Sequence, residues 1–154
     1  MRNWSDDPPE TWPENWPPAW IPIEMEIYKI PLVPSGEFAF MEFTRSQIER
    51  NHVVVFANKD SFIAKWGNPP TPGGLDAWKQ DFKILRGDAD DGFRKAHGCY
   101  NPVPLAEVGS ILNGKLRLDT GHTRTIWLLL HGAEIFPLSC PAGYAITLAE
   151  LVGI

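Results

Sequence analysis

The chain has 154 residues, of which 44% are hydrophobic and 21% charged, a balance that suits one packed domain and excludes wholesale disorder. No uncharged apolar run reaches the ~18–20 residues that a membrane helix needs, and the first residues lack the basic start and apolar stretch of a signal peptide. Two cysteines, Cys99 and Cys140, are too few for a disulfide framework or a four-cysteine zinc site. We therefore expect a cytoplasmic protein with no membrane insertion and no metal centre.

The first 22 residues differ in composition from the rest of the chain. Residues 1–26 hold six acids and one base, so this stretch carries the whole net charge of −5 and the remainder is formally neutral. Its prolines favour an extended arm over a helix. The arm either wraps its own domain and buries its indoles, or it binds a partner through them, since tryptophan offers a large apolar area. These partner-binding candidates are Trp4, Trp12, Trp16 and Trp20.

Residues 23–154 are expected to form one α+β domain with a small mixed sheet and short helices. Alternating or apolar runs predict strands at 23–30, 37–43 and 52–57, the last of them buried. Helical segments are expected at 44–50, from an N-cap at Asp60 to residue 66, and at 76–85. Proline, glycine and acidic residues indicate loops at 68–74 and 87–98. The acidic run at 88–91 lacks the spacing of a calcium-binding EF-hand loop and is expected to be solvated.

The last third of the chain has the clearest pattern. A strand is predicted at 115–119, then a break at Gly121, a helix over 123–131 ended by Gly132, and a strand over 135–140. Cys140 falls within that last strand, which predicts an inert buried thiol. The order is therefore strand, glycine turn, helix and strand.

The glycine turn carries the residues that can do chemistry. The amides of residues 122–124 open a helix and lack intrahelical acceptors, so together with Gly121, His122, Thr123 and Arg124 they predict an anion site. Arg124 can bind a phosphate, His122 can move a proton, and Asp119 can orient His122 or hold Mg²⁺. Alternatively, Arg124 pairs with Asp119 or caps carbonyl groups. His131 follows Arg124 by seven residues and can share its face, or it is simply a residue at the helix end.

Taken together, Gly121-His122-Thr123-Arg124, Gly132 and Pro137-Leu138 resemble the G-x-x-R box of the ParB/sulfiredoxin-like superfamily. The resemblance covers about residues 102–140 and implies a core of that type in the C-terminal part. The amino-acid sequence of residues 121–134 is most similar to plasmid fertility inhibition factors, and the chain also resembles them in having no helix-turn-helix motif. A second phosphate-binding box is missing after residue 140, and His122 and Thr123 stand where sulfiredoxins carry their catalytic cysteine.

This resemblance implies a plasmid-encoded protein that blocks conjugative transfer of a co-resident plasmid. In the first hypothesis it binds the type IV secretion coupling ATPase or its DNA complex, including single-stranded DNA. In the second it is a nucleotide hydrolase or nuclease that uses ATP or CTP with Mg²⁺, with Asp119, His122 and Arg124 as catalytic residues. A third possibility is that the box only stabilises the fold. The sequence leaves the oligomeric state open.

Overall fold

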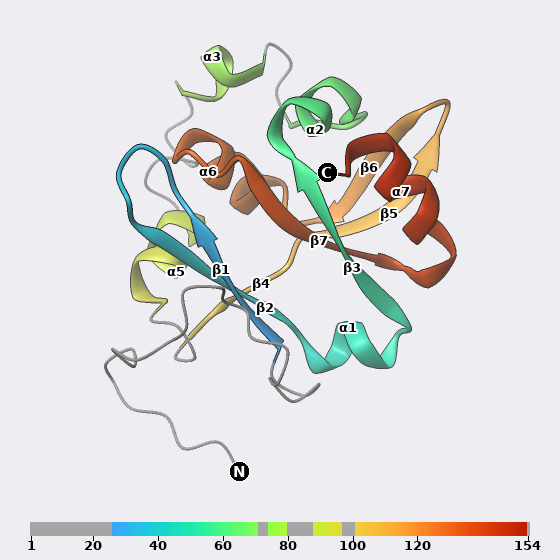
Figure 1. Cartoon of the computed structure of the whole chain (residues 1–154), viewed down its shortest axis with the longest axis horizontal. Coiled ribbons are helices and arrows are strands. Elements are labelled where there is room, and N and C mark those ends of the chain that lie inside the picture. The colour runs from blue at the N-terminus through green and yellow to red at the C-terminus, as the bar shows by residue number, and fades with distance from the viewer. Residues whose placement is uncertain (1–25, 71–73, 80–87, 97–100, 154) are drawn as a thin grey trace.

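The computed structural model describes residues 26–70, 74–79, 88–96 and 101–153, and Figure 1 shows their arrangement. The predicted arm of residues 1–22, with Trp4, Trp12, Trp16 and Trp20, lies outside the described residues, as does Cys99. The described part is an α+β fold with two small sheets, so the expectation of one mixed sheet is corrected. The strand orders are β1-β2-β4 and β3-β7-β5-β6.

The first sheet is built on a hairpin. Strands β1 (Glu26–Pro31) and β2 (Phe38–Phe43) pair antiparallel, and β4 (Val103–Pro104) adds parallel to β2. Both hairpin strands were predicted, although residues 23–25 of the first prediction lie outside the described residues. Alternation along β2 buries Ala39, Met41 and Phe43, which is the period-two pattern of a half-buried strand.

The second sheet contains the predicted strands β3 (His52–Asn58), β6 (Lys115–Thr120) and β7 (Ile135–Pro141). It also contains β5 (Glu107–Leu112), which the sequence did not predict, because Gly109, Ser110 and a shift in pairing register interrupt its alternation. The turn between β5 and β6 is Asn113-Gly114, with φ angles of 53° and 73°. Positive φ at both residues is typical of a type I′ hairpin. At the sheet edge, β3 is only partly buried, with Phe56 37% exposed, and this corrects the prediction of a buried strand.

The chain passes from one sheet to the other within two residues. The amide of Leu105 donates to the carbonyl of Glu42 in β2 at 3.0 Å. The carbonyl of the next residue, Ala106, accepts from the amide of Ser139 in β7 at 2.9 Å. Both crossover side chains are buried, so this segment joins the two sheets through the core.

Two short helices follow strands of different sheets. Helix α1 (Arg45–Glu49) was predicted, and a capping box between Thr44 and Gln47 begins it. Helix α2 (Lys59–Lys65) begins two residues earlier than expected: Asn58 is the N-cap and accepts from the amide of Ser61 at 2.9 Å, so the prediction of Asp60 as N-cap was wrong. An asparagine side chain serves this role as well as aspartate does.

The two predicted loops need correction. Helix α3 (Gly74–Trp78) begins inside the expected loop at 68–74, and the expected helical end at 85 lies outside the described residues. Helix α5 (Asp88–Lys95) replaces the solvated loop expected at 87–98. Its Asp90 accepts from Trp127 Nε1 at 2.9 Å and from Arg94 Nε at 2.8 Å, and its Phe93 ring stacks on the Trp127 ring at 4.2 Å. Tertiary contacts therefore hold a segment whose composition is typical of a loop.

Helix α6 (His122–Leu130) is the most buried helix of the described part, with residues 125–129 all enclosed. The chain then forms β7, a single 3₁₀ turn η2 (Ala142–Tyr144) and helix α7 (Ala145–Val152), which was not predicted. Leu148 and Val152 of α7 are fully buried, and α7 packs against β3. Cys140 is fully buried in β7, as predicted. No helix among the described residues has the length and apolar character needed to cross a membrane.

Candidate functional site

A tight turn at Gly121 places the start of α6 directly against the crossover segment. Gly121 has φ of 90°, and a Cβ atom added there would lie 2.5 Å from Ala106 Cβ and 2.7 Å from Ala106 Cα. Its carbonyl accepts from the amide and the hydroxyl of Thr125, at 2.9 and 2.7 Å. Glycine is therefore required here for both its backbone conformation and its size. The predicted break is confirmed, and the helix begins one residue earlier than expected.

The amino end of α6 offers backbone donors. The first intrahelical bond runs from the amide of Thr125 to the carbonyl of Gly121, so the amides of His122, Thr123 and Arg124 have no acceptor within the helix. These amides lie at the positive end of a nine-residue helix dipole. At the other end, Gly132 has φ of 94° and follows the C-cap His131, as predicted.

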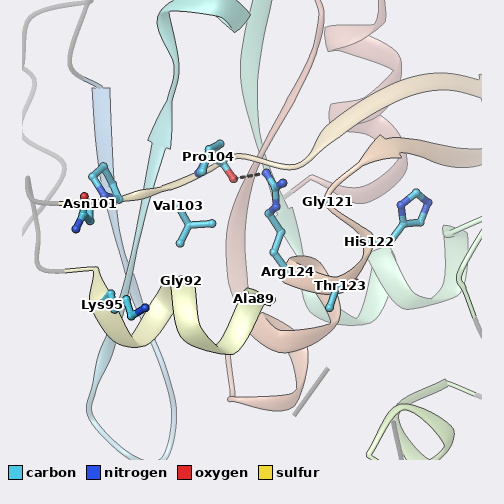
Figure 2. A pocket seen from close by; sticks show the side chains of 11 residues that line it. Ala89, Gly92, Lys95, Asn101, Val103, Pro104, Gly121, His122, Thr123 and Arg124 are labelled. Carbon is cyan, nitrogen blue, oxygen red and sulfur yellow. Dashed lines mark hydrogen bonds between the residues drawn. The ribbon is translucent and has the colours of Figure 1, made fainter. Parts of the chain in front are cut away.

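A cavity of about 590 Å³ opens at this helix end, between α5, β4 and α6 (Figure 2). Its volume is typical of small-molecule sites. Two of its lining side chains are basic and none of those described is acidic, so the charge distribution favours an anion. The lining residues are Ala89, Gly92, Lys95, Asn101, Pro102, Val103, Pro104, Gly121, His122, Thr123 and Arg124.

The guanidinium of Arg124 lies in this cavity without a carboxylate partner among the described residues. Its Nη1 donates to the carbonyls of Pro104 at 2.8 Å and Leu105 at 3.4 Å. Of the two structural alternatives, carbonyl capping is therefore found and pairing with Asp119 is not. Burial lowers the pKa of Arg124, which an arginine tolerates without losing its charge. Nε and Nη2 have no hydrogen-bond partner in the described part of the chain and remain as donors.

The ring of His122 turns away from Arg124 (Figure 2). Its Nε2 lies 3.2 Å from Nδ2 of Asn68. Oδ1 of that amide accepts from Trp66 Nε1 at 3.0 Å and from the Leu118 amide at 2.9 Å, which fixes Nδ2 as the donor. Nε2 of His122 must then accept, so the ring is neutral. Burial lowers the pKa of His122, which also favours the neutral ring. His122 thus tethers the helix start to the segment after α2.

Asp119 is not among the residues that line the cavity. Its carboxylate lies over Gly109 of β5, where a Cβ atom would overlap it. No hydrogen bond joins Asp119 to His122, whose ring is held by Asn68 instead. Within the described residues, no three His, Cys, Asp or Glu side chains gather closely enough to hold a metal ion. The structure therefore gathers the predicted Gly121, His122, Thr123 and Arg124 around the cavity, whereas the Asp119 side chain stands apart from it.

His131 lies at the opposite end of α6 from the cavity. Its ring stacks on Trp127 with 3.8 Å between centroids, and its Nδ1 lies 2.8 Å from the Trp127 carbonyl. The reading of His131 as a helix-end residue is therefore the one observed.

Sequence reasoning missed two residues of this site. Lys95 lines the cavity from α5, a segment that was expected to be a loop. Asn68 orients His122 from a segment rich in proline and glycine, and its side chain reproduces strand-like bonds to both the amide and the carbonyl of Leu118. If residues 88–95 are interpreted as a helix with Phe93 on its buried side, Lys95 falls at the end of that helix, where it can line a site. Asn68 gave no local signal.

Comparison with known proteins identifies relatives over most of the chain. A family model for plasmid fertility inhibition factors matches residues 53–153. The protein osa of Shigella flexneri is 32% identical over 136 residues, which span 83% of this chain and 69% of that protein. A crystal structure of the oncogenic suppression activity protein, a plasmid fertility inhibition factor in a gold(I) cyanide derivative, matches with a TM-score of 0.69. That match has 26% sequence identity and covers 90% of this chain and 73% of the other.

Proposed function

Because this chain belongs to the plasmid fertility inhibition factor family, we propose that it blocks conjugative DNA transfer of a co-resident plasmid by binding. The proposed target is the type IV secretion coupling ATPase, or its complex with the transferred single-stranded DNA, and the proposed location is the cytoplasm. The cavity at the start of α6 would bind a phosphate group of that complex. One observation carries this role: the Arg124 guanidinium keeps donors available beside helix amides that lack an intrahelical acceptor, and none of the described lining residues is acidic.

The chemistry of the cavity supports a phosphate more than a neutral ligand. Helix amides and an arginine edge provide directed donors, and Lys95 adds a second positive charge from the facing helix. Lys95 is exposed and forms no ion pair with another described residue. A phosphodiester oxygen placed between these groups would meet donors on two sides. A DNA backbone offers such oxygens at every nucleotide, so the site needs no particular base sequence.

The acidic arm of residues 1–22 is the second proposed contact. The arm holds four acids and one base, and residues 1–26 together carry the whole net charge of −5. An acidic segment with Trp4, Trp12, Trp16 and Trp20 is suited to a basic protein surface, such as one on which a coupling ATPase would hold DNA. In this proposal the arm competes with DNA electrostatically.

An enzymatic role as a nucleotide hydrolase or nuclease is the second candidate. The cavity volume of about 590 Å³ accommodates a nucleotide such as ATP or CTP with Mg²⁺, and Arg124 is placed to hold its phosphate. A ParB/sulfiredoxin-like core is inferred from the order β6, Gly121, α6, Gly132, β7. Against catalysis, the ring of His122 accepts from Asn68 and Asp119 lies over Gly109, so neither is free to move a proton beside Arg124. The arrangement therefore supports binding better than turnover.

Binding to the cavity is tested by fluorescence anisotropy with a labelled oligo-dT strand and by calorimetry with ATP and CTP, each with and without Mg²⁺. We expect Arg124→Ala to weaken binding of the oligonucleotide by about tenfold or more, because a charged hydrogen bond to phosphate is worth roughly 1.5–3 kcal/mol. Arg117→Ala is the matched control, since it removes an exposed arginine of β6. Equal loss in both variants would mean that only net charge matters and would reject the cavity as the site.

The inhibitory role is tested by mating. Cells carrying a conjugative plasmid and this gene should transfer that plasmid less often, and deletion of residues 1–22 should restore transfer and abolish co-purification with the coupling ATPase. Undiminished inhibition by the deletion variant would remove the arm from the mechanism. Hydrolysis of ATP or CTP, or cleavage of the oligonucleotide, that disappears in Arg124→Ala would favour the enzymatic candidate instead.

A further inference from the structure

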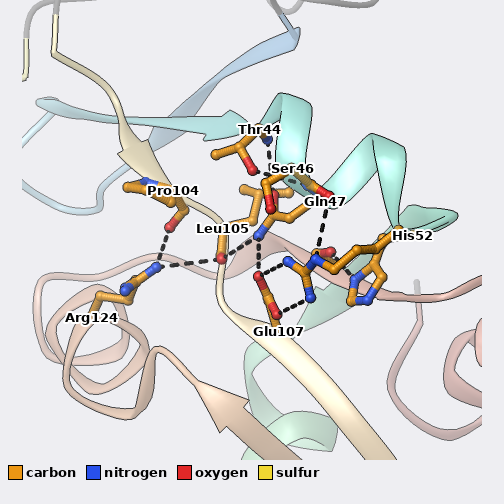
Figure 3. Close-up of polar contacts among 10 residues, drawn as sticks. Thr44, Ser46, Gln47, His52, Pro104, Leu105, Glu107 and Arg124 are labelled. Carbon is orange, nitrogen blue, oxygen red and sulfur yellow. Dashed lines mark hydrogen bonds and ion pairs between the residues drawn. The ribbon is translucent and has the colours of Figure 1, made fainter.

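We propose that Gln47, on α1 and outside the cavity, is a positioning residue that holds the Arg124 guanidinium in its binding orientation. The proposal rests on the proposed binding role of Arg124. The connection runs through one backbone carbonyl, that of Leu105, which accepts from Gln47 Nε2 at 3.0 Å and from Arg124 Nη1 at 3.4 Å (Figure 3). Leu105 lies in the crossover segment between the two sheets.

Gln47 is held in one orientation by the groups around it. The side chain is 1% exposed, although glutamine is usually a surface residue. Its Oε1 accepts from the amide of Thr44 at 2.9 Å. Its Nε2 donates one hydrogen to the Leu105 carbonyl and the other to Oε2 of Glu107 at 3.1 Å. Rotating the amide by half a turn would place a donor against a donor and an acceptor against two acceptors, so the orientation is fixed.

The acceptor on the far side of Gln47 is itself anchored. Arg50 binds Glu107 through both terminal guanidinium nitrogens, Nη1 to Oε1 at 3.0 Å and Nη2 to Oε2 at 2.6 Å. This bidentate pair leads the interactions that lower the pKa of Glu107, so the carboxylate stays ionised and stays in place. Arg50, Glu107 and Gln47 therefore form a rigid series that ends at the Leu105 carbonyl.

The consequence for the cavity is geometric. Arg124 makes its observed side-chain hydrogen bonds only to the carbonyls of Pro104 and Leu105 among the described residues. These two carbonyls decide which way the free Nε and Nη2 donors point. When the Leu105 carbonyl loses its partner on α1, the crossover segment gains freedom to rotate, and the guanidinium loses its preset direction. A preset direction matters because a phosphate must otherwise bear the cost of ordering that side chain.

The inference is tested in the full-length chain with two variants of the same capping box. Gln47→Met keeps the length of the side chain and removes its three side-chain hydrogen bonds. Thr44→Ala is the matched control. It removes the hydroxyl that accepts from the backbone N–H of Gln47 at 3.2 Å, and it leaves the hydrogen bond between the Gln47 side chain and the Leu105 carbonyl intact. Both variants should lower Tm, and only Gln47→Met should weaken binding of the oligo-dT strand, by about three- to tenfold, the value of one hydrogen bond.

A second readout needs no ligand. Rotation of the Arg124 guanidinium about its Nε–Cζ bond, followed by NMR of the side-chain nitrogens, should be slow in the wild type and in Thr44→Ala, and faster in Gln47→Met. If the wild type does not bind the oligonucleotide, the proposed binding role fails, and this measurement still decides the positioning role. Unchanged rotation and unchanged affinity in Gln47→Met would overturn the inference and leave the proposed function standing.

A third variant keeps the test decisive if Gln47→Met does not fold. Glu107→Gln removes the negative charge that anchors Nε2 of Gln47 while keeping the shape of the side chain. We expect a smaller change of the same kind: faster rotation of Arg124 and weaker binding. If Glu107→Gln lowers Tm but leaves both the rotation and the affinity as in Thr44→Ala, Gln47 has a structural role only.

Discussion

Replacing Gly121 by alanine would disturb the candidate site at the start of α6. Two separate costs arise there. The φ angle of 90° lies in the left-handed region, which costs an L-residue roughly 1–2 kcal/mol. The added Cβ would also lie 2.5 Å from Ala106 Cβ, and forcing a methyl group into a packed position typically costs about 1–3 kcal/mol. The two together predict that Gly121→Ala lowers the free energy of unfolding by about 2–5 kcal/mol.

The chain offers a control that separates these costs. Gly114 has φ of 73° in the β5–β6 turn, and a Cβ added there would meet nothing within 4 Å. Gly114→Ala therefore carries the backbone cost alone, about 1–2 kcal/mol. The difference between the two variants measures the close contact between Gly121 and Ala106. Adding Ala106→Gly to the Gly121→Ala variant should recover part of that difference, because it removes one of the two methyl groups.

The measurement is urea unfolding followed by circular dichroism, with the free energy taken from the midpoint and the slope. Equal destabilisation by Gly121→Ala and Gly114→Ala would refute the reasoning, because the contact with Ala106 would then be worth nothing. A recovery of zero in the double variant would show that the Ala106 methyl group contributes nothing to the cost, which would then lie in the backbone conformation or in the contact with Ala106 Cα.

Three further outcomes follow from single side chains. His122 should make the fold less stable in acid: its pKa in the folded state is below the ordinary 6.5, so the unfolded state binds more protons, and the free energy of unfolding falls as the pH drops through and below 6.5. Urea midpoints at several pH values should show a weaker dependence in His122→Gln, with part remaining because burial lowers the pKa of His52 as well. Asp90→Asn should cost about 1–3 kcal/mol in thermal unfolding, because a buried carboxylate that binds Trp127 and Arg94 is replaced by an amide that cannot accept from both equally well; a change within ±0.5 kcal/mol would contradict the role given to it. Cys140, whose pKa burial raises to about 11, should stay unlabelled by iodoacetamide at pH 8 when peptides are read by mass spectrometry, and should label once urea unfolds the chain.

The strand, glycine, helix and strand order of the last third could be predicted because each signal there is local. Gly121 and Gly132 both adopt positive φ, and the apolar run between them fills a buried helix. The amino end of α6, with its unpaired helix amides beside Arg124, followed from the same local signals. The family could be predicted as well, from the sequence of residues 121–134, and the comparisons confirm that family.

The contacts between distant segments could not be predicted, since they have no local signature. Helix α5 is stabilised by Trp127, which lies 37 positions away from Asp90, and its own composition is typical of a loop. Asp119 was expected to orient His122 from three positions earlier, but Asn68 holds the ring, from 54 positions earlier in the chain. Period and spacing predict which residues share one element, and they say nothing of which element packs on another.

We expect the crossover at Leu105 and Ala106 to couple the opening of the two sheets, because it is hydrogen-bonded to both. The amide of Leu105 in the crossover donates to the carbonyl of Glu42 in the first sheet. The amide of Ser139 in the second sheet donates to the carbonyl of Ala106, the next residue of the crossover. A fluctuation that opens either sheet at this point strains the connection to the other. Amide hydrogen exchange at these two positions should therefore proceed with similar protection, and any ligand that engages Arg124 should slow both together.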